Sequence, residues 1–191
     1  MSKTFVIDLD RCIGCQGCHV ACKQENGVSL GLYWNRVLTM GPNGRFPKVE
    51  MYFLPVMCQE CSNPPCVQVC PTGASQQMPD GIVLIDKAKC IGCELCVKAC
   101  PYGSRTLNPE TKVVEKCTTC VQLRESGSDP ACVINCPGRC RFFGDTSDPN
   151  STVSVAIKKA GAENVHSLPD SGNHPSVKYI LHPKNGVWRK P

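Results

Sequence analysis

Aromatic side chains and long apolar runs are scarce in this chain of 191 residues. Phe, Trp and Tyr make up 6% of the sequence, so we expect no large aromatic core. No stretch approaches the roughly 18 apolar residues of a membrane-spanning helix, which predicts that the chain makes no direct membrane span. The first residues lead into a predicted strand without the apolar segment of a signal peptide, so we expect no export signal in the chain itself.

Patterns for catalysis and for nucleic-acid binding are also missing. The sequence has no Ser/His/Asp set, no phosphate-cradling loop and no dinucleotide-binding fingerprint, and we therefore expect a protein that is not itself an enzyme. The formal net charge is +5, but Lys and Arg form no stripe of the kind that binds phosphates. No nucleic-acid partner is expected.

Cysteine, in contrast, is abundant, with seventeen residues. The odd count and the close spacing disfavour a disulfide framework, and structural zinc sites usually combine two separate Cys-x2-Cys pairs. The first block has the spacing Cys-x2-Cys-x2-Cys-x3-Cys, which bacterial ferredoxins use to bind a [4Fe–4S] cluster. It contains Cys12, Cys15, Cys18 and Cys22. We predict iron–sulfur clusters, and a zinc-binding or structural protein stays as a further alternative.

Three more blocks repeat this organisation. They contain Cys58, Cys61, Cys66 and Cys70; Cys90, Cys93, Cys96 and Cys100; and Cys117, Cys120, Cys132 and Cys136. The first block matches the third at an offset of 78 residues, and the second matches the fourth at an offset of 66. The repeat indicates duplication of a two-cluster ferredoxin unit. Sixteen cysteines could then hold four [4Fe–4S] clusters, and about two negative charges per cluster would bring the loaded chain near −3.

Two residues near the blocks have less certain roles. Cys140 is the seventeenth cysteine and follows Cys136 by four positions; we expect a buried free thiol rather than a ligand. His19 lies inside the first block, where it could line a cluster and tune its potential. A place on a helix face within a partner interface is an equally good interpretation of His19.

The remaining pattern predicts short elements separated by long loops. Strands are expected at 4–8, 49–54 (ending before Pro55), 82–86, 112–116 and 177–181, and helices at 23–26 and 151–160. Residues 28–48 are rich in Gly, Pro and Asn and are interpreted as a long ordered loop. The fold class is α+β.

Several motifs resemble a known family. They are Asn63-Pro64-Pro65-Cys66, Cys70-Pro71-Thr72-Gly73-Ala74, Cys100-Pro101-Tyr102-Gly103 and Phe143-Gly144-Asp145. Together with the four blocks, they resemble the four-cluster iron–sulfur subunit of molybdopterin oxidoreductases such as polysulfide, dimethyl sulfoxide and arsenate reductases. The resemblance covers nearly the whole chain, and its motifs do not specify a substrate.

The resemblance also implies how the blocks combine. One cluster would take Cys12, Cys15, Cys18 and Cys136; the next Cys22, Cys117, Cys120 and Cys132; a third Cys70, Cys90, Cys93 and Cys96; and the last Cys58, Cys61, Cys66 and Cys100. Residues 1–48 and 101–145 would form one ferredoxin-like unit and 49–100 an inserted second unit. Residues 146–191 would be an extension that packs on the core or on a partner. Pairing of consecutive blocks is the alternative that the spacing leaves open.

The function implied by the resemblance is electron transfer to or from a catalytic subunit that carries bis-molybdopterin guanine dinucleotide, in anaerobic respiration. The cluster of Cys12 would face that subunit, and the cluster of Cys58 would lie at the far end. A membrane anchor or a soluble donor would be a further partner. A free polyferredoxin, or the iron–sulfur subunit of a hydrogenase or formate-lyase complex, is the alternative. We expect the extracytoplasmic face, reached by co-export with a twin-arginine partner, and otherwise the cytoplasm.

Overall fold

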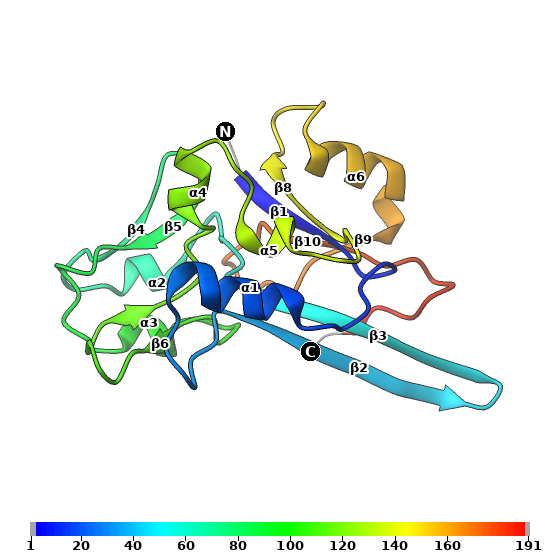
Figure 1. Cartoon of the computed structure of the whole chain (residues 1–191), viewed down its shortest axis with the longest axis horizontal. Coiled ribbons are helices and arrows are strands. Elements are labelled where there is room, and N and C mark those ends of the chain that lie inside the picture. The colour runs from blue at the N-terminus through cyan, green and yellow to red at the C-terminus, as the bar shows by residue number, and fades with distance from the viewer. Residues whose placement is uncertain (1–2, 190–191) are drawn as a thin grey trace.

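The computed structural model describes residues 3–189 and mixes short helices with short strands (Figure 1). In chain order the elements are β1 (Lys3–Asp8), α1 (Gly17–Asn26), β2 (Asn35–Arg45), β3 (Lys48–Met57), α2 (Pro65–Gln68), β4 (Ser75–Gln77), β5 (Val83–Ile85), α3 (Leu95–Lys98), β6 (Thr106–Leu107), β7 (Val114–Glu115), α4 (Val121–Glu125), α5 (Ala131–Ile134), β8 (Arg141–Asp145), α6 (Thr152–Ala160), a 3-10 turn (Ala162–Asn164), β9 (Val165–His166) and β10 (Lys178–Ile180).

The largest sheet joins the two ends of the described chain. Its strand order is β8-β1-β10-β9, and β1 pairs antiparallel with β8 and parallel with β10. Phe5, Val6 and Ile7 of β1 are fully buried, which explains why a run of aromatic and β-branched residues forms a central strand. The predicted strand at 177–181 is confirmed as β10. The segment after residue 146 therefore contributes two strands, β9 and β10, to this sheet.

Helix α6 covers one face of the same sheet. Ser151 caps its first turn by accepting a hydrogen bond from the Ser154 amide at 3.2 Å, and Gly161 follows its last residue. Val153 is fully buried and packs with Val6. The predicted helix at 151–160 is thus confirmed almost residue for residue.

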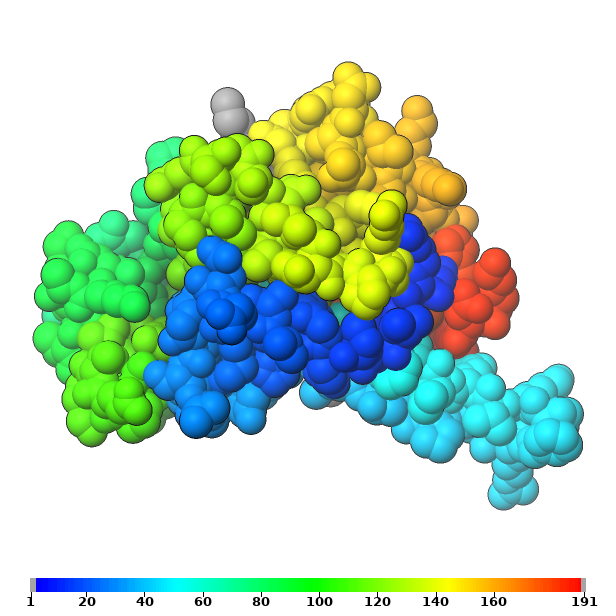
Figure 2. Space-filling model, in the orientation of Figure 1, coloured from blue at the N-terminus to red at the C-terminus, as the bar shows by residue number. Residues whose placement is uncertain are grey.

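A long hairpin replaces the loop that was expected at 28–48. Strand β2 pairs antiparallel with β3 from Asn35 opposite Met57 to Arg45 opposite Lys48, with an irregularity between Met40 and Asn43. The hairpin projects from the body of the molecule (Figure 2). Gly and Pro residues usually indicate a loop, but a bulge accommodates them here within a two-stranded ladder. Strand β3 also continues through Pro55, which lies opposite Val37, instead of ending before it, because in a two-stranded ladder each strand has an edge on which no backbone donor is needed.

The cysteine blocks lie in loops that run into short helices. Helix α1 packs on α5, and α2 packs on α3. The first block therefore lies beside the fourth, and the second beside the third. Gly14 and Gly92, at equivalent positions of the first and third blocks, both have positive φ, of 66° and 68°, the conformation that glycine adopts at little cost.

Candidate iron–sulfur sites

The structure gathers the sixteen block cysteines into four sets. We name these site 1 (Cys12, Cys15, Cys18 and Cys136), site 2 (Cys22, Cys117, Cys120 and Cys132), site 3 (Cys58, Cys61, Cys66 and Cys100) and site 4 (Cys70, Cys90, Cys93 and Cys96). None of the seventeen cysteines forms a disulfide. Sites 1, 2 and 4 each bring together the four cysteines that the resemblance implies. Sites 1 and 2 combine the first block with the fourth, and sites 3 and 4 combine the second with the third; the ligand assignment itself stays a prediction.

Sites 1, 2 and 4 each surround a hollow. Every cysteine of the three sets lines its own hollow. In the described part of the chain, no three Cys, His, Asp or Glu side chains converge closely enough to hold one metal ion. At each of these sites the sulfurs border a space instead of meeting at a point.

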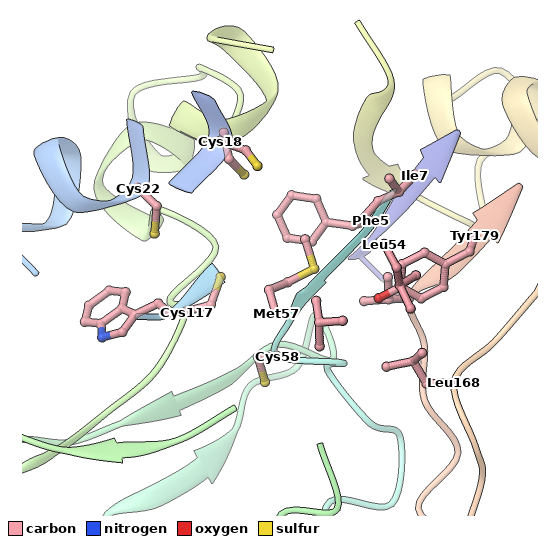
Figure 3. Packing of buried hydrophobic residues seen from close by; sticks show 14 of the residues in the cluster. Phe5, Ile7, Cys18, Cys22, Leu54, Met57, Cys58, Cys117, Leu168 and Tyr179 are labelled. Carbon is pink, nitrogen blue, oxygen red and sulfur yellow. The ribbon is translucent and has the colours of Figure 1, made fainter. Parts of the chain in front are cut away.

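Site 2 lies in the main hydrophobic core. Cys22, Cys117 and Cys132 are less than 8% exposed and pack with Phe5 and Met57; Figure 3 shows Cys22 and Cys117 on either side of the same space. Asn26 Nδ2 donates to Cys120 Sγ at 3.5 Å. Burial raises the pKa of the Cys22 thiol to about 12.

Site 3 is assembled around a buried arginine. Arg105 Nη2 donates to Cys66 Sγ at 2.9 Å, and its charge also acts on Cys58. The charges of Cys66 and Cys100 both act on Cys61, so these three sulfurs lie in one neighbourhood, and the place of Cys58 as the fourth member stays a prediction. Asn173 Nδ2, from the C-terminal segment, donates to Cys61 Sγ at 3.1 Å.

Site 1 contains a fifth sulfur. Cys140 is 3% exposed and lines the same hollow as the four site 1 cysteines. Its Sγ lies 3.4 Å from Cys136 Sγ and also pairs with Cys12. The expected burial of Cys140 is confirmed, and its proximity to Cys136 adds a second candidate for the fourth ligand. The choice of Cys136 as that ligand stays a prediction.

The chemistry of these sites fits iron–sulfur clusters. Thiolate sulfur is the ligand that holds [4Fe–4S] clusters, four per cluster, and here four block cysteines line each of three hollows, with Cys140 as a fifth sulfur at site 1. Burial raises the pKa of the thiols of Cys22, Cys58 and Cys117. Because a thiol must lose its proton to bind metal, cluster binding at these buried thiols is coupled to proton release.

The contacts order the four sites as 1, 2, 3 and 4. Arg141 lines the hollows of both site 1 and site 2. Lys116 precedes Cys117 of site 2, and its Nζ donates to Glu60 Oε1 at 3.1 Å, between Cys58 and Cys61 of site 3. Arg105 bonds Cys66 of site 3 and lines the hollow of site 4.

This order corrects one expectation. Cys58 was predicted at the far end from Cys12, but it packs in the core that also holds Cys22 and Cys117 (Figure 3). Site 4 lies at the far end instead. Strand β3 delivers Cys58 directly from the hairpin into the core, whereas Cys90 and Cys93 follow the small β4–β5 hairpin outward.

The sequence patterns did not reveal three buried cations. Arg105, Lys116 and Arg141 are 2% to 3% exposed. Arg105 and Arg141 each follow the last cysteine of a block, Cys100 and Cys136, by five positions, but the matched positions of the other two blocks hold Gly27 and Ser75. The repeat therefore gave no signal for their burial.

His19 lies on helix α1 beside Tyr33, and both of its predicted roles stay predictions. Its ring packs edge-on against Tyr33 with centroids 4.8 Å apart, beside Lys23, and it lines none of the three hollows. Burial, together with the Lys23 charge, lowers the pKa of His19. A place on the helix face fits these contacts better than a place against a cluster.

Two stretches of the chain match the family described as 4Fe-4S dicluster domain, at residues 11–74 and 49–146. The chain is 46% identical to a dimethyl sulfoxide reductase iron-sulfur subunit of Halobacterium salinarum, over 92% of this chain and 78% of that protein. It is 33% identical to the arsenate respiratory reductase iron-sulfur subunit of Shewanella sp. strain ANA-3, over 94% and 96%. It is 48% identical to the thiosulfate reductase electron transfer subunit of Salmonella typhi, over 72% and 72%.

Two dicluster domains account for four [4Fe–4S] clusters in this chain. Among the helices of residues 3–189, none has the length and apolar character to cross a bilayer. Two of these matches extend over nearly the whole chain, and all three proteins are iron–sulfur or electron-transfer subunits of reductases. The chain therefore belongs to the four-cluster, ferredoxin-type iron–sulfur subunits of the molybdopterin oxidoreductase family.

Proposed function

We propose that this chain is a non-catalytic subunit that relays electrons to or from a catalytic subunit carrying bis-molybdopterin guanine dinucleotide. The observation that carries the proposal is a row of four cysteine sites with buried middle members and accessible ends. Every cysteine of site 2 is buried, and so are three of the four at site 3. Cys15 of site 1 and Cys93 of site 4 are exposed.

The sixteen block cysteines are assigned as the ligands of the four clusters. A [4Fe–4S] cluster, when bound, supplies a centre that takes up and releases one electron. The cysteines fix the spacing between neighbouring sites because they come from paired blocks. Phe5, Met57 and Trp34 border site 2 and keep it dry, so the protein between the sites has little solvent to reorganise.

The surface around site 1 is proposed as the contact with the catalytic subunit. Ile13, Val20 and Ile134 are 63%, 64% and 59% exposed, and all three lie in the first and fourth blocks. Exposed apolar side chains that gather on one surface mark protein interfaces. Site 4 carries an equivalent side chain, Ile91, at 66% exposure, and would meet a membrane anchor or a soluble donor.

The domain organisation is part of the same proposal. Residues 1–48 with 101–145 form one ferredoxin-like unit and 49–100 the inserted unit, and the packing of α1 on α5 and of α2 on α3 supports this division. Residues 146–191 form the extension. We also propose the extracytoplasmic face as the location, reached by co-export with a twin-arginine partner, which fractionation of the source cells would test.

Purification of the tagged chain under anaerobic conditions from its own source tests the function. We expect molybdenum to co-purify with iron at about one atom per sixteen irons. Ile13→Asp should lose the molybdenum and keep the iron, because it places a charge at the proposed contact. Ile91→Asp is the matched control at the other end and should retain molybdenum. A fully loaded monomer without molybdenum would instead identify a free polyferredoxin.

A further inference from the structure

Two buried arginines have no carboxylate partner among the described residues. Arg105 and Arg141 are each 3% exposed. Arg105 Nη2 donates to Cys66 Sγ at 2.9 Å and to Ser75 Oγ at 2.8 Å, and its Nη1 has no hydrogen-bond partner within residues 3–189. Arg141 Nη2 lies 3.8 Å from Met57 Sδ, and its Nε and Nη1 are likewise unpartnered there.

Each arginine lies between two cysteine sites. Arg141 lines the hollows of sites 1 and 2, and Arg105 lines that of site 4 while it bonds a sulfur of site 3. Each therefore lies between the two sites of one pair, Arg141 between sites 1 and 2 and Arg105 between sites 3 and 4. Both follow the last cysteine of their block, Cys136 and Cys100, by five positions. The positions that the 66- and 78-residue offsets match to them hold Ser75 and Gly27, so each pair of sites has one such arginine.

A different arrangement separates the two units. Lys116, between sites 2 and 3, forms an ion pair with Glu60 at 3.1 Å, and the two side chains are 2% and 0% exposed. Glu60 Oε2 also accepts a hydrogen bond from the Val83 amide at 2.6 Å. This pair is neutral as a whole, whereas Arg105 and Arg141 each keep a full positive charge.

An uncompensated buried cation is strongly unfavourable, since charges leave water only when they are paired. Arginine stays protonated in proteins and cannot escape this cost by losing its proton. The anionic groups that Arg105 and Arg141 face must then come from the sites on either side. A cluster with four thiolates carries about −2 when oxidised and one more negative charge when reduced. A buried cation therefore favours the reduced form of both its neighbours.

We infer that Arg141 raises the reduction potentials of the clusters at sites 1 and 2 together, and that Arg105 raises those at sites 3 and 4. The neutral Lys116–Glu60 pair, between sites 2 and 3, does not raise the reduction potential of either neighbour. The inference rests on the ligand assignment of the proposed function. Arginine is suited to this place because its guanidinium presents donors to sulfurs on more than one side. One arginine thereby shifts the reduction potentials of both clusters beside it in the same direction.

Redox titration of the complete complex, followed by electron paramagnetic resonance, tests this inference. In Arg141→Gln, at a fixed potential, the ratio of reduced to oxidised cluster should fall at least tenfold at sites 1 and 2, which is about 59 mV for a one-electron couple. The change at sites 3 and 4 should be smaller than about threefold. Arg105→Gln should give the opposite pattern. Arg141→Lys and Arg105→Lys keep the charge and should restore most of the ratio.

Two controls isolate the effect of a buried charge. Arg36 is exposed and donates to the carbonyls of Tyr102 and Gly103; Arg36→Gln removes the same formal charge in contact with water and should shift no site more than about threefold. The double variant Lys116→Met/Glu60→Gln removes both charges of the neutral pair and should also leave every site within that range.

The iron content separates the inference from the ligand assignment. If the Gln variants bind fewer than sixteen irons, Arg141→Met and Arg105→Met, which remove the charge and keep a long apolar side chain, are compared with the charge-retaining Lys variants instead. Potentials that stay within threefold in the Gln variants, or that shift equally at all four sites, would overturn the inference while a full iron count upheld the ligands. An iron count below sixteen in the wild-type chain would refute the ligand assignment itself.

Discussion

The fourth ligand of site 1 is open to a direct experiment, because two cysteines compete for the place. Cys136 and Cys140 have sulfurs 3.4 Å apart and line the same hollow as Cys12. With Cys136 as the ligand, Cys140→Ser should leave about sixteen irons and sixteen sulfides per chain. Cys136→Ser should shift the spectrum of the site 1 cluster if Cys140 takes over as the fourth ligand, and should remove that spectrum if it does not. Removing both should take four irons, a quarter of the total.

Iron and sulfide analysis of anaerobically purified variants measures these counts, and potentiometric electron paramagnetic resonance shows which cluster changes. The site 2, 3 and 4 signals serve as internal controls and should stay reducible in all three variants. Electron delivery to the catalytic partner should fall in the single variant Cys136→Ser and in the double variant, but not in Cys140→Ser. Loss of a cluster in Cys140→Ser with a full count in Cys136→Ser would show that Cys140 is the ligand.

Three further outcomes follow from the packing. In Gly92→Ala, the added Cβ would collide with the Lys112 carbonyl oxygen at a φ of 68°, so the variant should lose the site 4 cluster faster on heating, by at least the ~1–2 kcal/mol of a left-handed residue; Gly73→Ala, with positive φ and open space, is its control. Glu60→Gln leaves Lys116 buried without its partner and should cost about 3–5 kcal/mol, measured as earlier thermal loss of the visible absorption, and Lys116→Met in the same chain should recover most of it. Leu181→Ala removes a side chain that is 1% exposed and should cost roughly 2–5 kcal/mol; unchanged thermal loss of absorption would show that the C-terminal segment is dispensable.

Cysteine spacing made the site largely predictable. The sequence indicated the ligand type, the four blocks and the number of clusters, because a [4Fe–4S] cluster demands four sulfurs at spacings that a short loop can reach. Strands β1 and β10 were predictable too, since buried strands need runs of apolar residues. The pairing of the first block with the fourth, and of the second with the third, depended on the resemblance. The spacing within a block carries no information on which other block lies beside it.

The failures have physical causes. The β2–β3 hairpin looks like a loop in the sequence because Gly41 and Pro42 are loop residues in most contexts, and a bulge overrides that preference. The place of Cys58 depends on where β3 enters the core, and this is decided by tertiary packing rather than by the local sequence. Arg105 and Arg141 look like any other arginines in a composition with 21 basic residues. Their burial becomes visible only when both sides of a unit are assembled.

The place of β1 between β8 and β10 has a consequence for biosynthesis. Strand β1 is synthesised before both of its neighbours and cannot complete its sheet until Tyr179, which pairs with Ile7, has been added. At about 5–20 residues per second, that takes roughly 10 to 35 s. During this interval β1 offers open edges to other chains. With the ligands proposed here, the first cysteine block must also wait for the fourth, so iron insertion at sites 1 and 2 would be a late event.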